Sequence, residues 1–385
     1  MRTQVGIIGA GPAGLTLSRL LHQNGIESVI VENRSRAYIE QRVRAGVLEQ
    51  GSMDLFNSLG IGERMMREGM QHHGIELRFS ETSHRIDFTQ LTGKSIIIYG
   101  QQEMVKDLVA AHLQEARPLL FEASDVSLDR IDSPTPVINF QYQGQAQQLQ
   151  CDYIAGCDGF HGISRQLMPA AQVYEHKFPF GWLGILAEVA PSSHELIYAS
   201  HDRGFALHSM RSPKLVRNYL QCALDEDINN WSDDRIWNEL QQRMALTDGF
   251  RLNEGRIIEK SVTSMRSFVV ETMQHGNLFL AGDAAHIVPP TGAKGMNLAL
   301  RDVVVLAKVL LDRYQSNNNS GLRQYSILCS RHVWKAQYFS VWMTSLLHRL
   351  DAQDDFQRKL QLTQLRAITE SVAGSTAMAE GYVGL

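Results

Sequence analysis

The chain has 385 residues, 44% of them hydrophobic and 20% charged, and its formal net charge is -4. This length predicts two or three sub-domains, and a chain without basic excess is a poor partner for nucleic acid. The longest apolar runs, such as 303–311, are too short to cross a membrane. The sequence opens on an apolar run at 4–8 without a charged leader, so we expect a cytoplasmic globular protein.

A strand, a glycine-rich turn, a helix and a second strand are predicted in the first 35 residues. Gly9, Gly11 and Gly14 follow the apolar run 5–8. Gly9 allows a tight turn, Gly11 lets a pyrophosphate approach the backbone, and Gly14 lets the helix pack on the strand. The next strand ends in Glu32, whose carboxylate can bind ribose hydroxyls. The pattern predicts a Rossmann-like dinucleotide site but does not separate NAD from FAD.

The rest of the chain is predicted in three stretches. A helical stretch at 45–69, interrupted at Gly60, leads into short strands at 75–100, a helix at 102–115 and strands at 120–155. A second β-rich stretch at 178–217 is followed by an amphipathic helix at 231–244 and a buried strand at 278–281. After Gly295 the apolar spacing is helical through 297–313, 322–347 and 354–372.

The cysteines and histidines give no sign of a disulfide framework or a metal site. Four cysteines are scattered without a C-x-x-C pair, at Cys151, Cys157, Cys222 and Cys329. Neither His72–His73 nor the Asp283 to His286 segment has further ligands at a useful spacing. We therefore expect no metal.

Two further motifs are a buried strand that runs into Gly282-Asp283 and a turn at Asp158-Gly159. Together with the glycine turn, and in this order, they resemble the FAD-dependent aromatic hydroxylases. The resemblance covers essentially the whole chain. The stretches that carry it are 44–51, 151–166, 180–184, 266–271, 282–297, 342–345 and 382–385.

The resemblance implies an α/β fold with a Rossmann-like FAD/NAD(P)-binding domain of the glutathione-reductase type. We expect residues 1–70, 98–175 and 266–295 to form this domain. A β-rich substrate domain is expected from 71–97 and 176–265, and a helical C-terminal region from 296–385. That helical region resembles the dimer-forming surface of the family, so a homodimer is expected.

FAD is the cofactor that the resemblance implies, bound tightly but not covalently. The residues expected to hold it are Gly9, Gly11, Gly14, Glu32, Arg42, Arg44, Gln101, Asp158 and Asp283. The Pro/Gly loop 289–297 should lie against the flavin ring, with contacts from Lys294, Gly295, Met296 and Asn297. Glycines allow close approach there, and a helix N-terminus with Lys294 would stabilise the negative charge of reduced flavin. Asn297 would hydrogen-bond the same edge.

A phenolic acid needs a cation at its carboxylate and a route for its phenolic proton. Ser209 and Arg211 fall on one face of a predicted strand. The resemblance places them and Tyr219 at the carboxylate. It also makes Tyr198, Tyr382 and His72 a proton relay, with His72 as the exit because histidine titrates near neutrality. The carbonyl of Pro290 would hold the substrate hydroxyl.

The activity that the resemblance implies is hydroxylation of 4-hydroxybenzoate beside its hydroxyl, giving 3,4-dihydroxybenzoate. Dioxygen and a pyridine nucleotide are consumed, and a flavin 4a-hydroperoxide delivers the oxygen. Residues expected to meet the nucleotide are Arg34, Tyr38, Arg42, His161 and Arg266. The family's NADPH-specific members have Arg-Gln after the acidic residue, where this chain has Asn33-Arg34. NADPH is expected, and NADH stays open.

Three alternative functions stay open at this point. The chain could hydroxylate another phenolic or aminobenzoic acid, reduce flavin without oxygenation, or bind ligands without catalysis. The intact Gly9, Gly11, Gly14, Glu32 and Asp283 set argues against the last of these.

Overall fold

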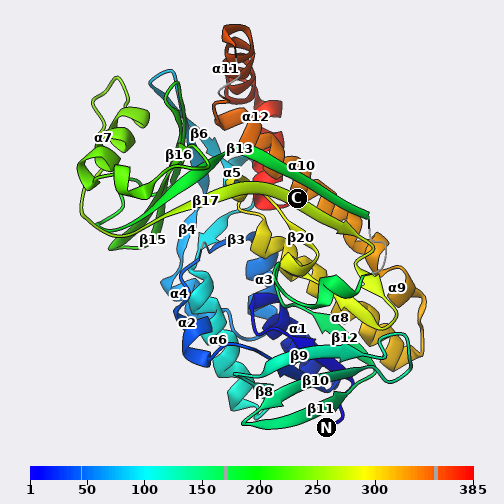
Figure 1. Ribbon diagram of the computed structural model, residues 1–385. Helices are drawn as coiled ribbons and strands as arrows, with labels where there is room; N and C mark the ends of the chain where they lie inside the picture. Colours follow the sequence, from blue (N-terminus) through cyan, green and yellow to red (C-terminus); the bar gives the residue numbers. More distant parts are fainter. Residues whose placement is uncertain (45, 169–171, 351–353) are drawn as a thin grey trace.

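The computed structural model describes residues 1–44, 46–168, 172–350 and 354–385. Ala45, at the start of an expected helical stretch, lies outside the described residues. Figure 1 shows a nucleotide-binding region around the N-terminus, a large sheet above it, and long C-terminal helices beside both. An α/β fold of this kind, with a helical C-terminal region, confirms the fold class expected from the sequence.

The nucleotide-binding region is built on a six-stranded sheet in the order β18-β19-β12-β1-β2-β8. Its central strands pair in parallel and are short, apolar and mostly buried, as parallel sheets covered on both faces require. The six strands are β1 (Val5–Ile8), β2 (Ser28–Val31), β8 (Leu119–Leu120), β12 (Tyr153–Gly156), β18 (Gln274–His275) and β19 (Leu278–Leu280).

The two faces of this sheet are covered by different layers. Helix α1 (Pro12–Gln23) packs against α6 (Gln101–Gln114) and α8 (Gly295–Ser316). An antiparallel sheet of β9 (Ser124–Asp129), β10 (Val137–Tyr142) and β11 (Gln145–Gln150) covers the other face. The approach there is close: a Cβ atom on Gly6 of β1 would lie 2.6 Å from Cδ1 of Ile138.

The large sheet has eight strands in the order β20-β17-β13-β16-β15-β14-β5-β6. Its strands are β5 (Gly74–Phe79), β6 (Thr82–Asp87), β13 (Gln172–Glu188), β14 (Leu196–His201), β15 (Gly204–Ser212), β16 (Leu215–Cys222), β17 (Arg256–Glu271) and β20 (His286–Ile287). Because side chains alternate along a strand, one face packs against α7 (Asp233–Arg243) and the other against the C-terminal helices. Those helices are α10 (Tyr325–Leu347), α11 (Asp355–Thr369) and α12 (Val372–Val383).

A further small sheet of three strands, in the order β3-β7-β4, occupies part of a region that was expected to be helical. Residues 45–69 were expected to be helical, but β3 (Val47–Glu49) precedes α3 (Gln50–Ser58) and α4 (Glu63–Glu68). Strand β3 forms because its backbone pairs with β7 (Ile96–Ile98), which also pairs with β4 (Met70–His72). The remaining short helices are α2 (Arg36–Gln41), α5 (Phe88–Thr92) and α9 (Ser320–Arg323).

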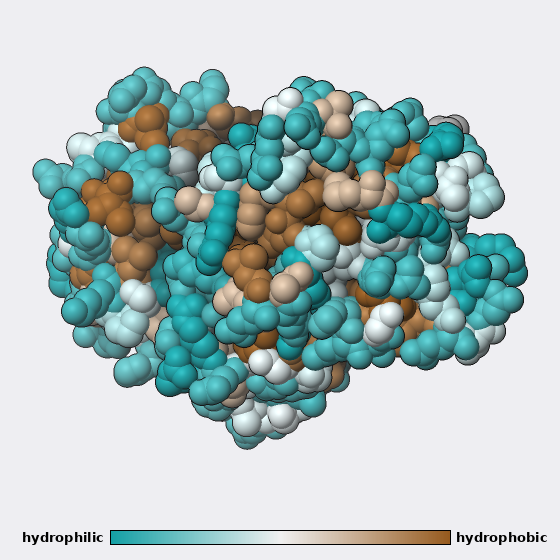
Figure 2. All heavy atoms as spheres, turned by 90° about the horizontal axis from the view of Figure 1, so that it is seen from below, coloured by the Kyte–Doolittle hydropathy of each residue, from teal (hydrophilic) through white to brown (hydrophobic). Residues whose placement is uncertain are grey.

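The long strands β13 and β17 pair along almost their whole length, from Gln172 opposite Glu271 to Glu188 opposite Arg256. Their register shifts between Lys177 and Gly181. The domain boundaries expected at 175/176 and 265/266 lie within these two strands. Seen from below in Figure 2, the surface is mostly hydrophilic, with several apolar patches, one of them extending through the centre of this face. None of the described helices combines the length and apolarity needed to cross a bilayer.

Candidate active site

The glycine turn after β1 has the geometry of a dinucleotide cradle. Gly9 is left-handed (φ 100°) and Gly11 is the N-cap of α1. A Cβ atom on Gly14 would lie 2.0 Å from the carbonyl oxygen of Gly9, so the helix closes tightly on the turn. A Cβ atom on Gly11 would meet nothing within 4 Å. The space beside Gly11, at the positive end of the helix, is therefore open for an anion.

Glu32, at the end of β2, is buried beside this turn. Its carboxylate accepts hydrogen bonds from the backbone N–H groups of Ala10 and Arg34, both at 2.7 Å. These two bonds fix the carboxylate at the rim of the cradle. Lone pairs remain on both oxygens for ribose hydroxyls.

The Asp158 segment lies directly against the glycine turn. A Cβ atom on Gly9 would come within 2.4 Å of the carbonyl oxygen of Cys157, so only glycine permits this approach. One carboxylate oxygen of Asp158 accepts from the Ser164 N–H at 2.9 Å. The other is buried with no partner among the described residues. Burial raises the pKa of Asp158. An unpartnered buried oxygen beside the cradle fits a site that receives a polar ligand.

Arg44 and Asp283, both expected to contact FAD, lie close to each other. Arg44 lies 4.0 Å from the carboxylate of Asp283, and both side chains are partly exposed. Gln101 begins α6, directly after a segment in which the Tyr99 N–H donates to Gly46 O at 2.8 Å. The structure thus brings the segments of Arg44, Gln101 and Asp283 toward one site.

The loop before α8 was expected to present Lys294 to a flavin ring. The ammonium group instead donates to the carboxylate of Glu49 at 2.6 Å and to the Tyr382 carbonyl at 2.7 Å. Burial lowers the pKa of Lys294, while Glu49 opposes this effect. Arg301 also contacts Glu49, at 3.0 Å. The charge of Lys294 is therefore balanced within the protein.

The side chain of Asn297 is also fully engaged by the protein. Its oxygen accepts from the Glu49 N–H at 3.0 Å and from the Ser52 hydroxyl at 2.7 Å. Its amide donates to the carbonyls of Val47 at 2.9 Å and Ala293 at 3.1 Å. The structure does not support the expected bond from this side chain to a flavin.

The backbone of α8 remains free to meet a ligand. The first N–H groups of a helix have no intrahelical partner. In α8 these belong to Gly295, Met296 and Asn297. A Cβ atom on Gly295 would meet only Val288, at 3.8 Å, so the backbone is open to close approach.

Three residues expected at a substrate carboxylate meet on β15 and β16. The guanidinium of Arg211 donates to the Ser209 hydroxyl at 2.6 Å and to Tyr219 at 3.3 Å. It also donates to the Met210 carbonyl at 2.9 Å. No acidic side chain in the described part of the chain pairs with Arg211. Burial lowers the pKa of the Arg211 guanidinium. A shielded guanidinium without a carboxylate partner has the capacity to bind an anion.

The tyrosines expected to relay a proton are in direct contact. The hydroxyls of Tyr198 and Tyr382 lie 2.6 Å apart, and both side chains are fully buried. Burial raises the pKa of each phenol well above its usual value. Neither tyrosine therefore ionises near neutrality. Each can pass a proton only by receiving another as it gives one up.

His72 differs from its expected role as a near-neutral exit. The ring is buried, and burial lowers its pKa to about 4, so it is uncharged at neutral pH. Both ring nitrogens lack a partner in the residues that the structure describes. The neighbouring His73 carbonyl accepts from the Phe88 N–H at 2.7 Å, and the Phe88 ring stacks on Tyr382. No direct hydrogen bond therefore joins Tyr382 and His72 within the described chain.

Pro290 is exposed at the start of a short 3₁₀ turn. Its carbonyl accepts from the Ala293 N–H at 3.0 Å, which leaves one lone pair for a further donor. The nearby Thr291 hydroxyl lies 2.8 Å from that of Thr344 on α10, so the loop is anchored to the helix.

The residues expected to meet a pyridine nucleotide form two groups. Around the exposed Tyr38, the guanidinium carbons of Arg34 and Arg42 lie 5.2 and 5.9 Å from the ring centre. Around Phe160, Arg266 lies 3.7 Å from the ring centre and the His161 ring packs edge-on. Both groups present positive charge beside aromatic surface.

Three buried polar residues near the site were not predicted from the sequence. Glu49 holds Lys294 and Arg301. Asp302 lies in the apolar face of α8, and His348 accepts from the Trp182 indole N–H at 2.6 Å. For Asp302 the available signal was an acidic residue at helical spacing from the apolar Leu298, Ala299, Val305 and Leu306, whereas Glu49 had no local signal.

A family described as FAD binding domain matches residues 2–340. A p-hydroxybenzoate hydroxylase from Acinetobacter baylyi is 47% identical over 388 residues, which cover 100% of this chain and 96% of the relative.

Among solved structures, a p-nitrophenol 4-monooxygenase from Pseudomonas putida has a TM-score of 0.82 at 15% identity, covering 98% of this chain and 97% of that one. An anhydrotetracycline hydroxylase from Streptomyces rimosus has a TM-score of 0.78 at 19% identity, covering 100% and 76%. These two likenesses support the fold alone. The family match and the full-length relative show more: the chain belongs to the FAD-dependent aromatic monooxygenases, the family of p-hydroxybenzoate hydroxylase.

Proposed function

We propose that this chain hydroxylates 4-hydroxybenzoate at the carbon beside its hydroxyl, giving 3,4-dihydroxybenzoate. The observation that carries the proposal is the shielded Arg211 guanidinium, which has hydroxyl partners but no carboxylate partner in the described chain. The name of the 47% identical relative supports the same substrate.

In this proposal the substrate carboxylate supplies the missing anion. Arg211 would hold it through two charge-assisted hydrogen bonds, because its planar fork matches a carboxylate. The hydroxyls of Ser209 and Tyr219 already lie within hydrogen-bond distance of the guanidinium and would complete the contact.

The opposite end of the ring would lie toward Tyr198. Strand register places Tyr198, Leu207 and Tyr219 opposite one another on β14, β15 and β16, so they share one face of the sheet. Strands lie about 4.8 Å apart, so Tyr198 and Tyr219 are separated by roughly 10 Å. A small para-substituted ring with one polar group at each end matches this separation.

Tyr198 and Tyr382 would carry the phenolic proton away from the substrate. A free phenol titrates near pH 10, so ionising it at neutral pH needs hydrogen bonds to the anion and a route for the proton. The 2.6 Å contact between the two hydroxyls supports such a route. His72, through water, would be its next member.

The cradle fits FAD on several independent observations. These are the open backbone at Gly11, the fixed carboxylate of Glu32, the unpartnered oxygen of Asp158 and the free amides at the start of α8. When bound, FAD supplies the electron transfer from the nicotinamide and the activation of dioxygen. The protein supplies orientation and a shielded pocket that keeps water from the reaction.

A Gly11→Ala variant tests the cradle. Gly11 has an extended conformation and its added methyl meets no protein atom, so we expect the unfolding temperature without cofactor to change by less than about 2 °C. The methyl would occupy the pyrophosphate's approach, so FAD affinity should fall by tenfold or more. Flavin fluorescence after dilution of the purified protein measures this. Full FAD retention would contradict the pyrophosphate assignment.

The two aromatic–cation groups support a pyridine nucleotide as electron donor. Arg34 and Arg42 flank Tyr38 in a position suited to a 2′-phosphate, and this favours NADPH. Arg266 and His161, around Phe160, would meet the remainder of the nucleotide.

Oxygen uptake with NADPH or NADH, with and without 4-hydroxybenzoate, tests the function directly. We expect the aromatic acid to accelerate uptake, about one 3,4-dihydroxybenzoate per dioxygen consumed, and faster turnover with NADPH. Accelerated uptake that yields only hydrogen peroxide would mean that another ring is the true substrate. Oxygen uptake that does not respond to aromatic acids would indicate a flavin reductase. A purified protein without flavin would contradict the proposal that the chain is a flavin-dependent enzyme.

A further inference from the structure

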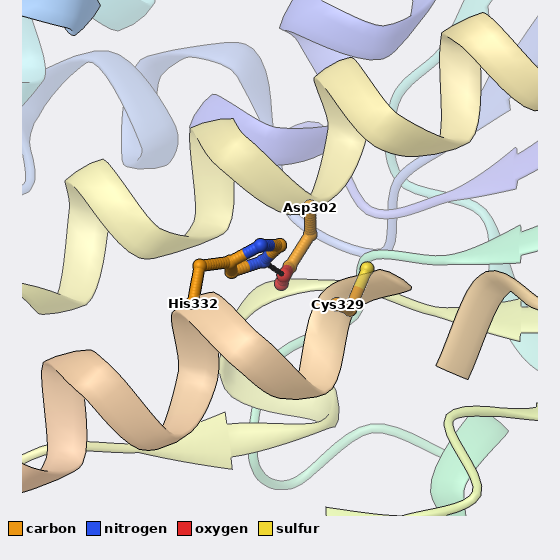
Figure 3. A group of neighbouring side chains, drawn as sticks. All are labelled: Asp302, Cys329 and His332. Atoms are coloured by element: carbon orange, nitrogen blue, oxygen red, sulfur yellow. Dashed lines mark hydrogen bonds and ion pairs between the residues drawn. The ribbon is translucent and has the colours of Figure 1, made fainter. Parts of the chain in front are cut away.

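Asp302 is a fully buried carboxylate on the apolar face of α8. One of its oxygens accepts from the Gly282 N–H at 2.9 Å and from His286 Nε2 at 2.6 Å. The other accepts from His332 Nε2 at 2.8 Å, as Figure 3 shows. Elements far apart in the sequence, β20, α8 and α10, thus converge on one carboxylate.

This cluster is better described as a hydrogen-bonded network than as a metal site. Asp302, Cys329 and His332 lie close enough to be considered as ligands (Figure 3). Both oxygens of Asp302 are already occupied by donors, and burial raises the pKa of the Cys329 thiol, so the thiolate that a metal needs is disfavoured. The charge on Asp302 is balanced instead by His286, whose pKa is raised.

The backbone group that Asp302 holds belongs to the turn that carries Asp283. Gly282 is left-handed (φ 65°), and a Cβ atom there would lie 3.1 Å from Ala299 and 3.8 Å from Ala13. The turn therefore lies between the N-terminal parts of α1 and α8, and Asp302 holds its backbone from α8. Asp283, the next residue, is partly exposed toward Arg44.

We propose that Asp302, oriented by His286 and His332, is a positioning residue that fixes the Gly282–Asp283 turn for FAD binding. The proposal rests on the FAD contact proposed for Asp283. A charged acceptor makes a stronger bond to the Gly282 N–H than a neutral one. The two histidines hold the carboxylate in the orientation that the N–H requires, so loss of either should misplace Asp283.

FAD release from the diluted holoenzyme, followed by flavin fluorescence, tests the proposal. We expect Asp302→Asn to weaken FAD binding about tenfold or more, because the acceptor loses its charge and one of its two accepting oxygens becomes an amide group that cannot accept. His332 is partly exposed, so its variants should fold: His332→Ala should weaken FAD several-fold. His332→Gln, which keeps a donor at the same position, should stay within about twofold of the wild type. Asp312→Asn, the same change three turns further along α8, is the matched control.

Asp283→Asn separates this proposal from the one on which it rests. If Asp283→Asn weakens FAD but Asp302→Asn does not, the positioning role is overturned while the Asp283 contact stands. If Asp283→Asn leaves FAD affinity unchanged, the proposed Asp283 contact itself has failed. If Asp302→Asn does not fold, the His332 pair decides: equal FAD affinity in His332→Ala and His332→Gln overturns the proposal.

Discussion

Replacing Arg211 with glutamine should raise the dissociation constant for 4-hydroxybenzoate by at least 100-fold. Two charge-assisted bonds are lost, each worth about 1.5–3 kcal/mol, and each 1.4 kcal/mol is a factor of ten. The substrate carboxylate would also be left in a shielded site with no cation, which is costly. Titration of the holoenzyme with substrate, followed by the flavin absorbance change, measures the effect.

Two further variants make the Arg211 result specific. Arg211→Lys keeps the charge but not the planar fork, so we expect an intermediate loss of about tenfold or more. Arg203 belongs to the same hairpin but pairs with Glu239 at the surface, so Arg203→Gln should leave substrate affinity within about twofold. Wild-type affinity in Arg211→Gln would remove the guanidinium from the substrate site.

A Tyr198→Phe variant should keep FAD and substrate but lose most product formation, by about 100-fold or more. The change removes the hydroxyl that contacts Tyr382 at 2.6 Å, and positioned proton transfer typically contributes 10²–10⁴ in rate. Because the aromatic ring is kept, the packing against Phe205 should persist. Oxygen consumed without product should appear as hydrogen peroxide, measured beside 3,4-dihydroxybenzoate.

Comparison with Tyr382→Phe shows whether the two tyrosines form one route. If they do, the double variant should be about as impaired as either single variant, since residues that act as a unit are not additive. Tyr338→Phe, at a residue that is 72% exposed, should retain full coupling. Unchanged product yield in Tyr198→Phe would exclude the relay.

Local patterns predicted the nucleotide-binding region well. The spacing of Gly9, Gly11, Gly14 and Glu32 depends on contacts within the first 32 residues, and such contacts leave a direct mark on sequence. The helices after Gly295 were also predicted from apolar periodicity. Strand β3 was predicted as helix because its pairing partner, β7, lies about 50 residues away and leaves no local signal.

No individual strand was predicted at the 16-residue β17, although its residues up to 265 were expected to belong to the β-rich domain. Much of it is half-exposed, and its regularity comes from pairing with β13 rather than from a strict alternation of apolar residues. Tertiary context of this kind overrides local propensity.

In the candidate site, too, some features were predicted from the sequence and others depend on distant parts of the chain. The residues grouped by resemblance, Arg211 with Ser209 and Tyr219, and Tyr198 with Tyr382, lie together in the structure. The electrostatic surroundings could not be predicted, because they depend on distant partners. Glu49 neutralises Lys294 from 245 positions away, and burial removes the near-neutral pKa expected of His72.

The contact between Tyr198 and Tyr382 joins residues 184 positions apart and crosses from β14 to α12. Contacts of such long sequence separation form slowly, because the entropy of closing the loop must be overcome before the contact stabilises anything. The glycine turn and Glu32 close over a much shorter stretch of chain. During refolding the glycine turn should therefore form early. FAD retention also needs the distant segments of Asp158, Asp283 and Gly295, so it should recover late, together with coupled hydroxylation.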